Sequence, residues 1–370
     1  MSVSWPDVSL GEVCEFKYGK SLPGGKRAGG DVPVFGSNGV VGSHNAAITK
    51  GATIIVGRKG SFGEVNVSLV PCWPIDTTYY IDKSATKADL KWLAYRLTGL
   101  GLTELNKAAA IPGLNREDAY RRRLLLPPLA EQRRIAEVLD RAEALRAKRR
   151  DALAQLDTLT QAFFLDLFGD PVPNPKRWPD PKLGGLLTFQ QYGPRFYNEP
   201  YSVDGIRIVR ITDLNEAGTL DFAEMPRLAV SNADRTKYAL HPGDLIFART
   251  GATVGKVALI QQDDPPCIAG AYFITMRFVK TLEPVYARAV LMAPSIRAIV
   301  AKRSRQAAQQ NFSGPGLRQL PMPLPPLELQ RDFSRRVSAV EKLKAAHRAS
   351  LTEMDALFAS LQHRAFRGEL

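Results

Sequence analysis

The sequence has few of the residues that build disulfide frameworks and metal sites. Its 370 residues include only three cysteines and four histidines. Cys14, Cys72 and Cys267 stand far apart, none belongs to a CxxC pair, and the histidines lack the spacing of metal ligands. We therefore expect neither a disulfide scaffold nor a metal site. Such cysteine usage fits a protein of the reducing cytoplasm.

Long apolar runs are also missing. No stretch approaches the ~18 residues that a membrane-spanning helix needs. The first residues, MSVSWPDVSLGEV, have neither the basic region nor the apolar region of a signal peptide. We therefore expect no membrane partner. Hydrophobic residues still make up 45% of the sequence, and its length suits two or three domains of about 100–200 residues each.

Catalytic motifs are absent or incomplete. The run GATVGK (251–256) resembles a phosphate-binding loop, but it is one residue short between its glycines. Val257 then stands where a magnesium-binding Ser or Thr is required. No Asn-Pro-Pro-aromatic run of the methyltransferase kind occurs, and Asp76 and Asp82 lack the Glu-x-Lys partner of a nuclease site. We expect no catalytic residue and no cofactor in this chain.

Positive charge is present in surplus. Lys and Arg number 50 against 37 Asp and Glu, which gives a formal net charge of +13. A surplus of this size indicates a polyanionic partner, with nucleic acid first and an acidic membrane surface second. A basic protein from a basic proteome is the alternative, because net charge alone is a weak sign of function.

Two halves of the chain repeat the same landmarks in the same order, which is the sign of an internal duplication. Each half opens on Trp-Pro-Asp, at Trp5 and at Trp178. Each then has a strand-like segment with an arginine followed by spaced glycines, in which Arg58 corresponds to Arg249. Because these arginines recur at the same place, they are the strongest single candidates for a shared role. Bonding the carbonyls of a turn is the alternative role.

Two further landmarks follow each strand-rich region. LPPLAEQR (126–133) returns 198 positions later as LPPLELQR (324–331). The helix after each motif ends in an aromatic-rich turn, where Phe168 corresponds to Phe366. The length from the motif to the helix end is the same in both halves, whereas the strand-rich regions differ in length. This pattern indicates a fixed frame that carries two different domains.

The pattern predicts an α+β fold with two β-rich domains and two long helices. Runs of Val, Ile, Thr and Tyr between turn residues indicate strands at 32–35, 52–57, 63–69 and 77–81, and again at 206–211, 244–248, 256–260 and 271–279. Helical spacing appears at 89–100 and at 285–304, with a break near Pro294. The expected segments are 1–125, 126–170, 171–323 and 324–370.

The two long helices carry apolar residues at heptad spacing, which is typical of helices that pack against another helix. The predicted seam comprises Ile135, Val138, Ala142, Leu145, Leu156, Leu159, Phe163, Phe333, Val340, Leu343, Met354, Leu357 and Leu361. We expect an intramolecular antiparallel coiled coil with pseudo-two-fold symmetry and a domain at each end. Helices that dock separately on their own domains are the alternative.

Helix length gives an expected spacing. The 29 residues from Ile135 to Phe163 span about 43 Å at the helical rise of about 1.5 Å per residue. On B-DNA that distance covers about 12–13 base pairs, or just over one turn. Two domains so separated would meet two half-sites with an unread spacer between them.

At this point the residues resemble a known family, the specificity subunits of Type I restriction–modification systems. The resemblance rests on residues 108–140, which read AAAIPGLNREDAYRRRLLLPPLAEQRRIAEVLD, and on the end RAFRGEL (364–370). VPVFGSNGVVG (32–42), IIVGRKGSFGEV (54–65) and CWPIDTTYY (72–80) add to it. Each segment is weak alone, but their combination is specific and covers nearly the whole chain. The second half departs slightly, with Leu329 in place of Glu131.

The resemblance implies two target-recognition domains and two conserved helices that bind two modification subunits. In such systems the modification subunits use S-adenosylmethionine to methylate adenine, and restriction subunits cleave unmodified DNA with ATP and Mg²⁺. It implies a non-catalytic, cytoplasmic DNA-binding subunit of phage defence, whose double-stranded target is bipartite and asymmetric. A stand-alone DNA-modifying enzyme and a coiled-coil scaffold that binds no DNA are the alternatives.

Side chains that read bases or hold phosphates carry hydrogen-bonding groups on loops and strand ends. In the first half the candidates are Lys17, Lys20, Lys26, Arg27, Ser37, Asn38, Arg58 and Lys59. In the second half they are Arg195, Arg207, Arg210, Arg249, Thr250, Lys256, Gln310 and Asn311. A solvated surface side chain is the alternative for each of them.

Overall fold

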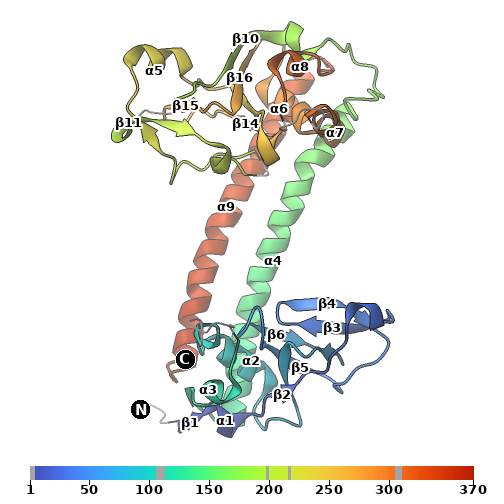
Figure 1. Cartoon of the computed structure of the whole chain (residues 1–370), viewed down its shortest axis with the longest axis vertical. Helices are drawn as coiled ribbons and strands as arrows, with labels where there is room; N and C mark the ends of the chain where they lie inside the picture. The colour runs from blue at the N-terminus through green and yellow to red at the C-terminus, as the bar shows by residue number, and fades with distance from the viewer. Residues whose placement is uncertain (1–4, 106–112, 197–199, 216–217, 305–310) are drawn as a thin grey trace. The chain divides into compact units, whose positions relative to one another are not determined.

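A computed structural model describes residues 5–105, 113–196, 200–215, 218–304 and 311–370 (Figure 1). The chain divides into two compact units. Unit 1 comprises residues 1–151 and 348–370, and unit 2 comprises residues 152–347. Each unit therefore contains one β-rich region together with part of both long helices, α4 (Leu129–Phe168) and α9 (Leu327–Ala365).

Unit 1 is built on two sheets and three short helices. One sheet has the strand order β2-β8-β5-β6, the second β4-β3-β7, and β1 pairs with β9. The strands are β1 (Asp7–Ser9), β2 (Lys17–Tyr18), β3 (Val32–Gly36), β4 (Gly39–His44), β5 (Thr53–Gly57), β6 (Val65–Ser68), β7 (Trp73–Pro74), β8 (Thr78–Asp82) and β9 (Arg123–Leu125). The helices are α1 (Leu10–Val13), α2 (Leu90–Thr98) and α3 (Arg116–Tyr120).

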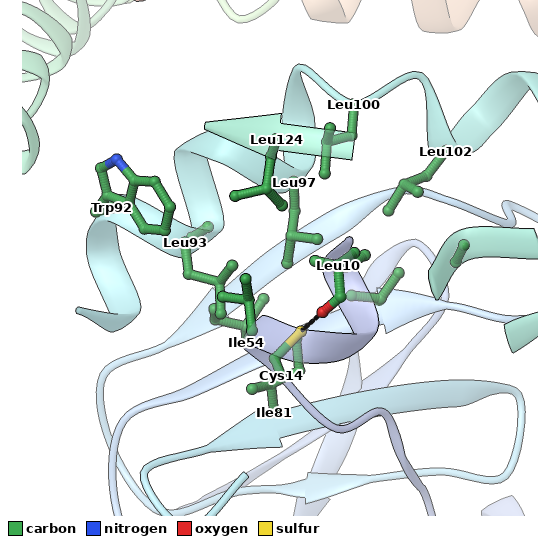
Figure 2. Close-up of a cluster of buried hydrophobic side chains, with 14 of the residues drawn as sticks. Leu10, Cys14, Ile54, Ile81, Trp92, Leu93, Leu97, Leu100, Leu102 and Leu124 are labelled. Atoms are coloured by element: carbon green, nitrogen blue, oxygen red, sulfur yellow. Dashed lines mark hydrogen bonds between the residues drawn. The ribbon is translucent and has the colours of Figure 1, made fainter. Parts of the chain in front are cut away.

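The core of unit 1 joins the first sheet to both long helices. Strand β5, whose residues are all buried, packs with α1 and α2, as Figure 2 shows for Ile54, Leu10 and Trp92. Helix α2 begins where the Asp89 carboxylate accepts hydrogen bonds from the backbone N–H groups of Lys91 and Trp92, both at 3.0 Å. Residues from the start of α4 and the end of α9 complete the same core.

Unit 2 repeats this plan with two sheets, in the orders β10-β16-β13-β14 and β12-β11-β15. The strands are β10 (Leu187–Tyr192), β11 (Tyr201–Val209), β12 (Arg227–Leu228), β13 (Leu245–Ala248), β14 (Val257–Leu259), β15 (Cys267–Ala269) and β16 (Phe273–Phe278). The helices are α5 (Asn232–Tyr238), α6 (Pro284–Met292), α7 (Pro294–Ser304) and α8 (Gly314–Arg318). Helices α6 and α7 meet at a bend of 63°, because Pro294 holds Ala293 in an extended conformation.

The strand pairings of the two main sheets correspond between the units, so the duplication seen in the sequence is also structural. In each unit the first strand of the smaller sheet pairs in parallel with a short later strand, β3 with β7 and β11 with β15. In each unit the central strand of the larger sheet, β5 or β13, pairs with two antiparallel neighbours. The α+β class with two β-rich regions is thus confirmed.

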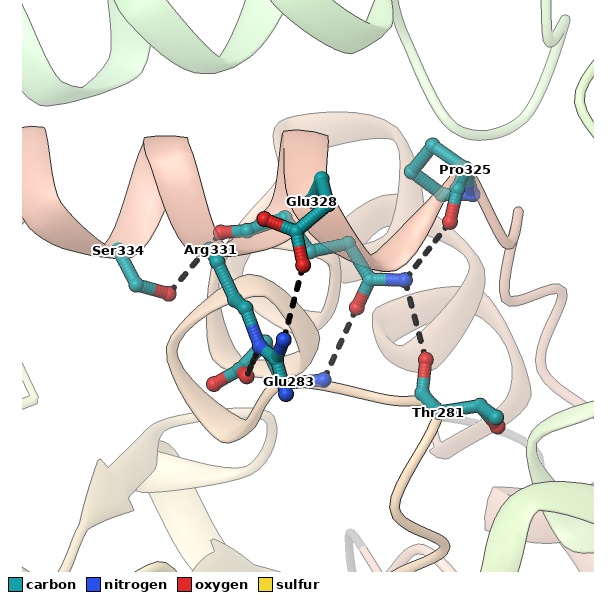
Figure 3. Close-up of polar contacts among 7 residues, drawn as sticks. Thr281, Glu283, Pro325, Glu328, Arg331 and Ser334 are labelled. Carbon is teal, nitrogen blue, oxygen red and sulfur yellow. Dashed lines mark hydrogen bonds and ion pairs between the residues drawn. The ribbon is translucent and has the colours of Figure 1, made fainter.

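A buried glutamine joins each long helix to its own domain in the same way. The Gln330 side-chain oxygen accepts from the Glu283 backbone N–H at 2.9 Å, and its Nε2 donates to the Pro325 carbonyl at 2.8 Å (Figure 3). Gln132 makes the equivalent bonds to the Asp89 N–H and the Pro127 carbonyl, both at 2.8 Å. The repeated Gln in the Pro-Pro-Leu motif therefore fixes the start of each long helix against a domain helix.

The two long helices run antiparallel within each unit. In unit 1, Ile135 and Leu139 near the start of α4 share the core with Ala365 and Phe366 at the end of α9. In unit 2, Phe164 and Phe168 near the end of α4 lie 5.9 Å and 5.4 Å from Phe333 at the start of α9, measured between ring centroids. The expected antiparallel helix pair is confirmed, and separate docking of each helix on its own domain is not observed.

Two equivalent ion pairs cross between the helices. In unit 1, Arg146 of α4 approaches Asp355 of α9 to 2.6 Å. In unit 2, Lys344 of α9 approaches Asp157 of α4 to 2.7 Å. Both members of the second pair stand 198 positions from their counterparts, the same offset as the Pro-Pro-Leu motif. The helix pair therefore repeats its own contacts, which fixes its register.

One half of the predicted heptad seam is correct and the other is shifted by one residue. Ile135, Phe333 and Val340 are buried, and Ala142, Leu156, Phe163, Met354 and Leu361 are partly buried. The second line of seam residues instead follows Leu139 and Arg146 on α4, and Val337 and Lys344 on α9, each four residues after a first-line position.

The residues predicted for that second line lie one position earlier, on a flank of the helix pair. Leu145, Leu343 and Leu357 are 56%, 47% and 60% exposed, so the seam prediction was wrong for them. Val138 and Leu159 are partly buried. The error arises because the true line contains charged Arg146 and Lys344, whereas the flank has the more apolar sequence.

No single helix in the described ranges is long and apolar enough to span a membrane; the bent pair α6–α7 passes that test by length and composition only.

Candidate nucleic-acid interface

The repeated arginine of each unit stacks on a tyrosine of the neighbouring sheet edge. The Arg58 guanidinium carbon lies 5.4 Å from the centre of the Tyr18 ring of β2, and the Arg249 carbon lies 4.8 Å from that of Tyr192 of β10. Both tyrosines are exposed, at 53% and 43%. Arginine and exposed aromatic rings in one place can contact phosphates, base edges and base faces.

The backbone around these arginines is also equivalent. The Arg58 N–H donates to the Thr77 carbonyl, and its own carbonyl accepts from the Leu114 N–H, both at 2.9 Å. Arg249 likewise donates to the Tyr272 carbonyl at 2.8 Å, and its carbonyl accepts from the Phe312 N–H at 2.7 Å. Each arginine therefore sits on a strand end held from two sides, which presents it in a fixed position.

The two arginines differ in how their side chains are held. Arg58 donates from Nε and Nη2 to the Asp76 carbonyl, at 3.1 and 2.6 Å, so it also stabilises a turn. The Nε of Arg249 is buried and has no hydrogen-bond partner in the described part of the chain. The turn-holding alternative thus applies to Arg58, whereas no such hydrogen bond to a turn carbonyl holds the Arg249 side chain in the described part of the chain.

Ser37, Arg58 and Lys59 come together around one carbonyl group. The Ser37 hydroxyl and the backbone N–H groups of Arg58 and Lys59 all donate to the Thr77 carbonyl, at 2.7, 2.9 and 3.1 Å. The Lys59 side chain is exposed, as is Asn38 at the β3–β4 turn, whereas Ser37 is 8% exposed. Ser37 therefore stabilises the loop from its buried side. Its prediction as a surface contact is wrong in this structure.

The remaining first-half candidates fall into two groups. Lys17 is tied to Asp82 at 3.2 Å, and Arg27 donates from Nη1 to the Val41 carbonyl at 2.5 Å. Lys20 and Lys26 are exposed. Lys20 and Lys26 suit phosphate contacts, because their exposed ammonium groups are free to reorient toward DNA.

The second-half candidates are more varied. Arg195 and Asn311 are exposed. Thr250 pairs with Asn311 in an isolated antiparallel β-bridge. Arg210 is held by Asp213 at 2.6 Å, a hydrogen bond that raises the pKa of the guanidinium. Arg207 is partly buried on β11.

The last two second-half candidates are Lys256 and Gln310. Lys256 is 8% exposed, so its prediction as a surface contact is wrong in this structure. Gln310 lies outside the described residues.

Sequence reasoning missed three arginines. Arg116 also contacts the Tyr18 ring, with its guanidinium carbon 5.5 Å from the ring centre. Arg227 and Arg235 line a cavity beside Arg207. The two tyrosines share a signal, because a glycine follows each of them, Gly19 and Gly193, whereas no arginine of the first half corresponds to Arg227 or Arg235.

Neither a metal cluster nor a disulfide occurs among the residues with described positions. No group of three or more His, Cys, Asp or Glu side chains there could hold a metal ion. Cys14, Cys72 and Cys267 are free and buried. Burial raises the pKa of the Cys14 and Cys267 thiols to about 12.

Comparison with known proteins identifies the family. A family model described as the Type I restriction modification DNA specificity domain matches residues 2–155 and again residues 175–353. The specificity subunit of the Type I restriction enzyme EcoBI from Escherichia coli is 22% identical over 351 residues, which covers 86% of this chain and 73% of that protein. The EcoKI specificity subunit of strain K12 is 26% identical over 265 residues, 66% of this chain and 57% of that protein.

Solved structures agree on the fold. The S subunit of a Type I restriction–modification system from M. genitalium is similar with a TM-score of 0.62 and 15% identity, over 98% of this chain and 96% of that one. A chain from a structural study of assembly and conformational transition of the type I R-M system gives 0.60 and 19%, over 100% and 99%. With a specificity-domain match in each half, this protein belongs to the specificity subunits of Type I restriction–modification systems, the members of those systems that carry no catalytic site.

Proposed function

We propose that this chain reads a bipartite, asymmetric sequence in double-stranded DNA and directs adenine methyltransferase subunits to it. The observation that carries the proposal is the duplicated arginine–tyrosine pair, Arg58 with Tyr18 and Arg249 with Tyr192. Two copies of one reading element on one chain suit two half-sites. Their surroundings differ, so the half-sites should differ as well.

A fixed gap between the half-sites is part of the proposal. Helix α4 is continuous over 40 residues and contributes to the cores of both units. The ion pairs of Arg146 and Lys344 hold its register against α9. A helix cannot lengthen or shorten without breaking these contacts, which supports a constant number of unread base pairs.

The proposed docking surface of the partner subunits lies on the helix pair. Leu145 and Leu357 in unit 1, and Leu343 in unit 2, are exposed and stand one residue before seam positions. Leu145 and Leu343 are also equivalent in the repeat. Helices with apolar residues beside the seam are typical of bundles that receive further helices. The duplication of this flank supports two copies of one modification subunit as its occupants.

The chemistry is assigned to the partners. S-adenosylmethionine would bind the methyltransferase subunits, and ATP with Mg²⁺ would bind restriction subunits where these are present. This chain would contribute sequence recognition and assembly. We propose that this chain itself requires no cofactor.

The test is to purify the chain with the methyltransferase encoded beside it and to measure DNA binding and methylation. We expect binding that weakens steeply with salt, because neutralised phosphates release counterions. We expect adenine methylation only by the complex. Methyl transfer by the purified chain alone would favour a stand-alone enzyme, and the absence of DNA binding in both samples would favour a scaffold.

A further inference from the structure

One segment of the smaller sheet is longer in unit 2 than in unit 1. Between β3 and β5 the first unit has 16 residues (37–52), whereas between β11 and β13 the second has 35 (210–244). The longer segment supplies strand β12, which occupies the place of β4, and helix α5, which lies beside the β12-β11-β15 sheet in Figure 1. Among the described residues no helix lies between β3 and β5, so α5 adds surface to one recognition domain only.

Three arginines line a cavity of about 350 Å³ between helix α5 and the smaller sheet of unit 2. Arg207 comes from β11, Arg227 from β12 and Arg235 from α5. Gly205, Leu240 and Cys267 contribute to the walls. Three separate elements thus contribute an arginine each to the lining of one cavity.

The positive charge of the cavity is poorly compensated. In the part of the chain that the structure describes, the side chains of Arg207 and Arg235 make no hydrogen bond and no ion pair. Arg227 donates from Nη1 to the Val203 carbonyl at 3.0 Å, which positions it without neutralising it. Positive charges that line one cavity repel one another. An anion that binds in the cavity is therefore attracted by all three arginines.

Two acidic side chains lie near this segment, and neither forms an ion pair with the three arginines in the described part of the chain. The Asp264 carboxylate is close enough to raise the pKa of Cys267, but it accepts a hydrogen bond from the Gln261 N–H at 2.8 Å. Asp234 beside Arg235 is bonded to the Ser231 hydroxyl at 2.8 Å. Burial raises the pKa of Cys267 to about 12, so its thiol stays neutral and supplies no negative charge.

We propose that the cavity of Arg207, Arg227 and Arg235 binds one backbone phosphate of double-stranded DNA next to the half-site read by unit 2. The proposal rests on the proposed DNA-reading function and adds to it a contact that unit 1 lacks. Arginine suits this task because its planar donors match phosphate oxygens in pairs. Such a contact sets the register of the domain on the duplex without reading a base.

The test measures DNA affinity of the complex against salt concentration for Arg207→Gln, Arg235→Gln and the double variant. Losing one phosphate contact should reduce the slope of log affinity against log salt by about 1. Since all three arginines hold the same phosphate, the double variant should lose little more than either single one. Arg235→Lys keeps the charge and should retain most of the slope.

Two controls make the result specific. Lys280→Gln removes one exposed charge of the same unit beyond the far end of β16, and it should leave the slope nearly unchanged. Replacing single phosphates by neutral methylphosphonates should reveal one position whose effect disappears in Arg235→Gln. Thermal melting of each variant checks that the unit remains folded.

The outcomes separate this inference from the proposed function. If the unaltered complex does not bind DNA, the proposed function fails and the inference fails with it. If that complex binds DNA but Arg207→Gln and Arg235→Gln behave like Lys280→Gln, only the phosphate site is refuted. Weaker binding of a partner subunit with an unchanged salt slope would assign the cavity to a protein carboxylate instead.

Discussion

Arg249 stacks on Tyr192, with 4.8 Å between the guanidinium carbon and the ring centre, and the same pair recurs as Arg58 on Tyr18. Because Arg249 is a proposed base contact, Arg249→Gln should weaken specific DNA binding by about 1–3 kcal/mol, or roughly 5-fold to 150-fold. Thermal stability should change little, because the side-chain Nε of Arg249 has no partner to lose within the described residues. Fluorescence anisotropy with a target duplex measures the affinity, and Lys280→Gln is the charge-matched control.

Arg58→Gln should behave differently. It removes two hydrogen bonds to the Asp76 carbonyl, so it should lower the free energy of unfolding of unit 1 by about 1 kcal/mol as well as weaken DNA binding. Urea unfolding monitored by circular dichroism measures the first effect. Equal stability losses for Arg58→Gln and Arg249→Gln would contradict the distinction between the two sites.

The ion pair of Lys344 and Asp157 should be asymmetric in its response to mutation. The Lys344 side chain is 7% exposed, whereas that of Asp157 is 58% exposed. Asp157→Ala leaves a buried charge with Glu341 as its remaining acidic partner and should cost about 1–2 kcal/mol. Lys344→Met should cost less, because the solvated aspartate tolerates the loss. A double-mutant cycle by urea unfolding measures both, and a larger loss for Lys344→Met would refute the argument.

The two glutamines of the Pro-Pro-Leu motifs should be of similar importance. Gln132→Ala and Gln330→Ala each leave backbone N–H and carbonyl groups without their hydrogen-bond partner. Each should lower the free energy of unfolding by about 1–3 kcal/mol. Hydrogen exchange should locate the first effect at the start of α2 and the second at the start of α6. Exposed Gln155→Ala on α4 serves as the control and should have no such effect.

The three thiols should be inert in the folded protein. Cys14, Cys72 and Cys267 are buried, and burial raises the pKa of Cys14 and Cys267 to about 12. A thiol reagent at pH 8 should therefore react slowly until the chain is unfolded. Since the thiolate is favoured in the unfolded chain, stability should fall as the pH rises from about 9 toward 12. Rapid native-state labelling of these residues would contradict the structure.

The exposed leucines beside the helix seam, Leu145, Leu343 and Leu357, form a flank whose role can be tested without DNA. Leu357→Lys should weaken association with the methyltransferase subunit at least about 10-fold, because it places a charge in an apolar contact. Folding should be retained, since Leu357 is 60% exposed. Thr352→Lys, an equal change of charge at an exposed α9 residue outside the flank, should bind normally. Equal loss of binding by both variants would point to charge rather than to the flank.

The sequence was most informative where the duplication acts as an internal comparison. Arg58 and Arg249 were found because two copies agree, and the structure places both on equivalent strand ends. The first line of the helix seam was also predicted correctly, because Ile135 and Phe333 are buried at heptad positions.

The sequence was less informative where a residue type conflicts with its surroundings. The second seam line was misplaced because Arg146 and Lys344 occupy partly buried or buried positions that hydrophobic patterning assigns to apolar residues. Lys256 looked like a surface charge but is buried, and Arg227 and Arg235 match no arginine of the first half. These positions are determined by tertiary contacts, which local pattern does not reveal.

The central claim, that one chain carries two different DNA readers held at a fixed spacing, has one direct test. The chain and its methyltransferase subunit are expressed in a host that lacks adenine methylation, and every methylated adenine is mapped by sequencing. The account predicts one two-part motif with unlike halves and an invariant gap, and loss of the motif on Arg249→Gln. A single undivided motif, or a gap that varies from site to site, would contradict it.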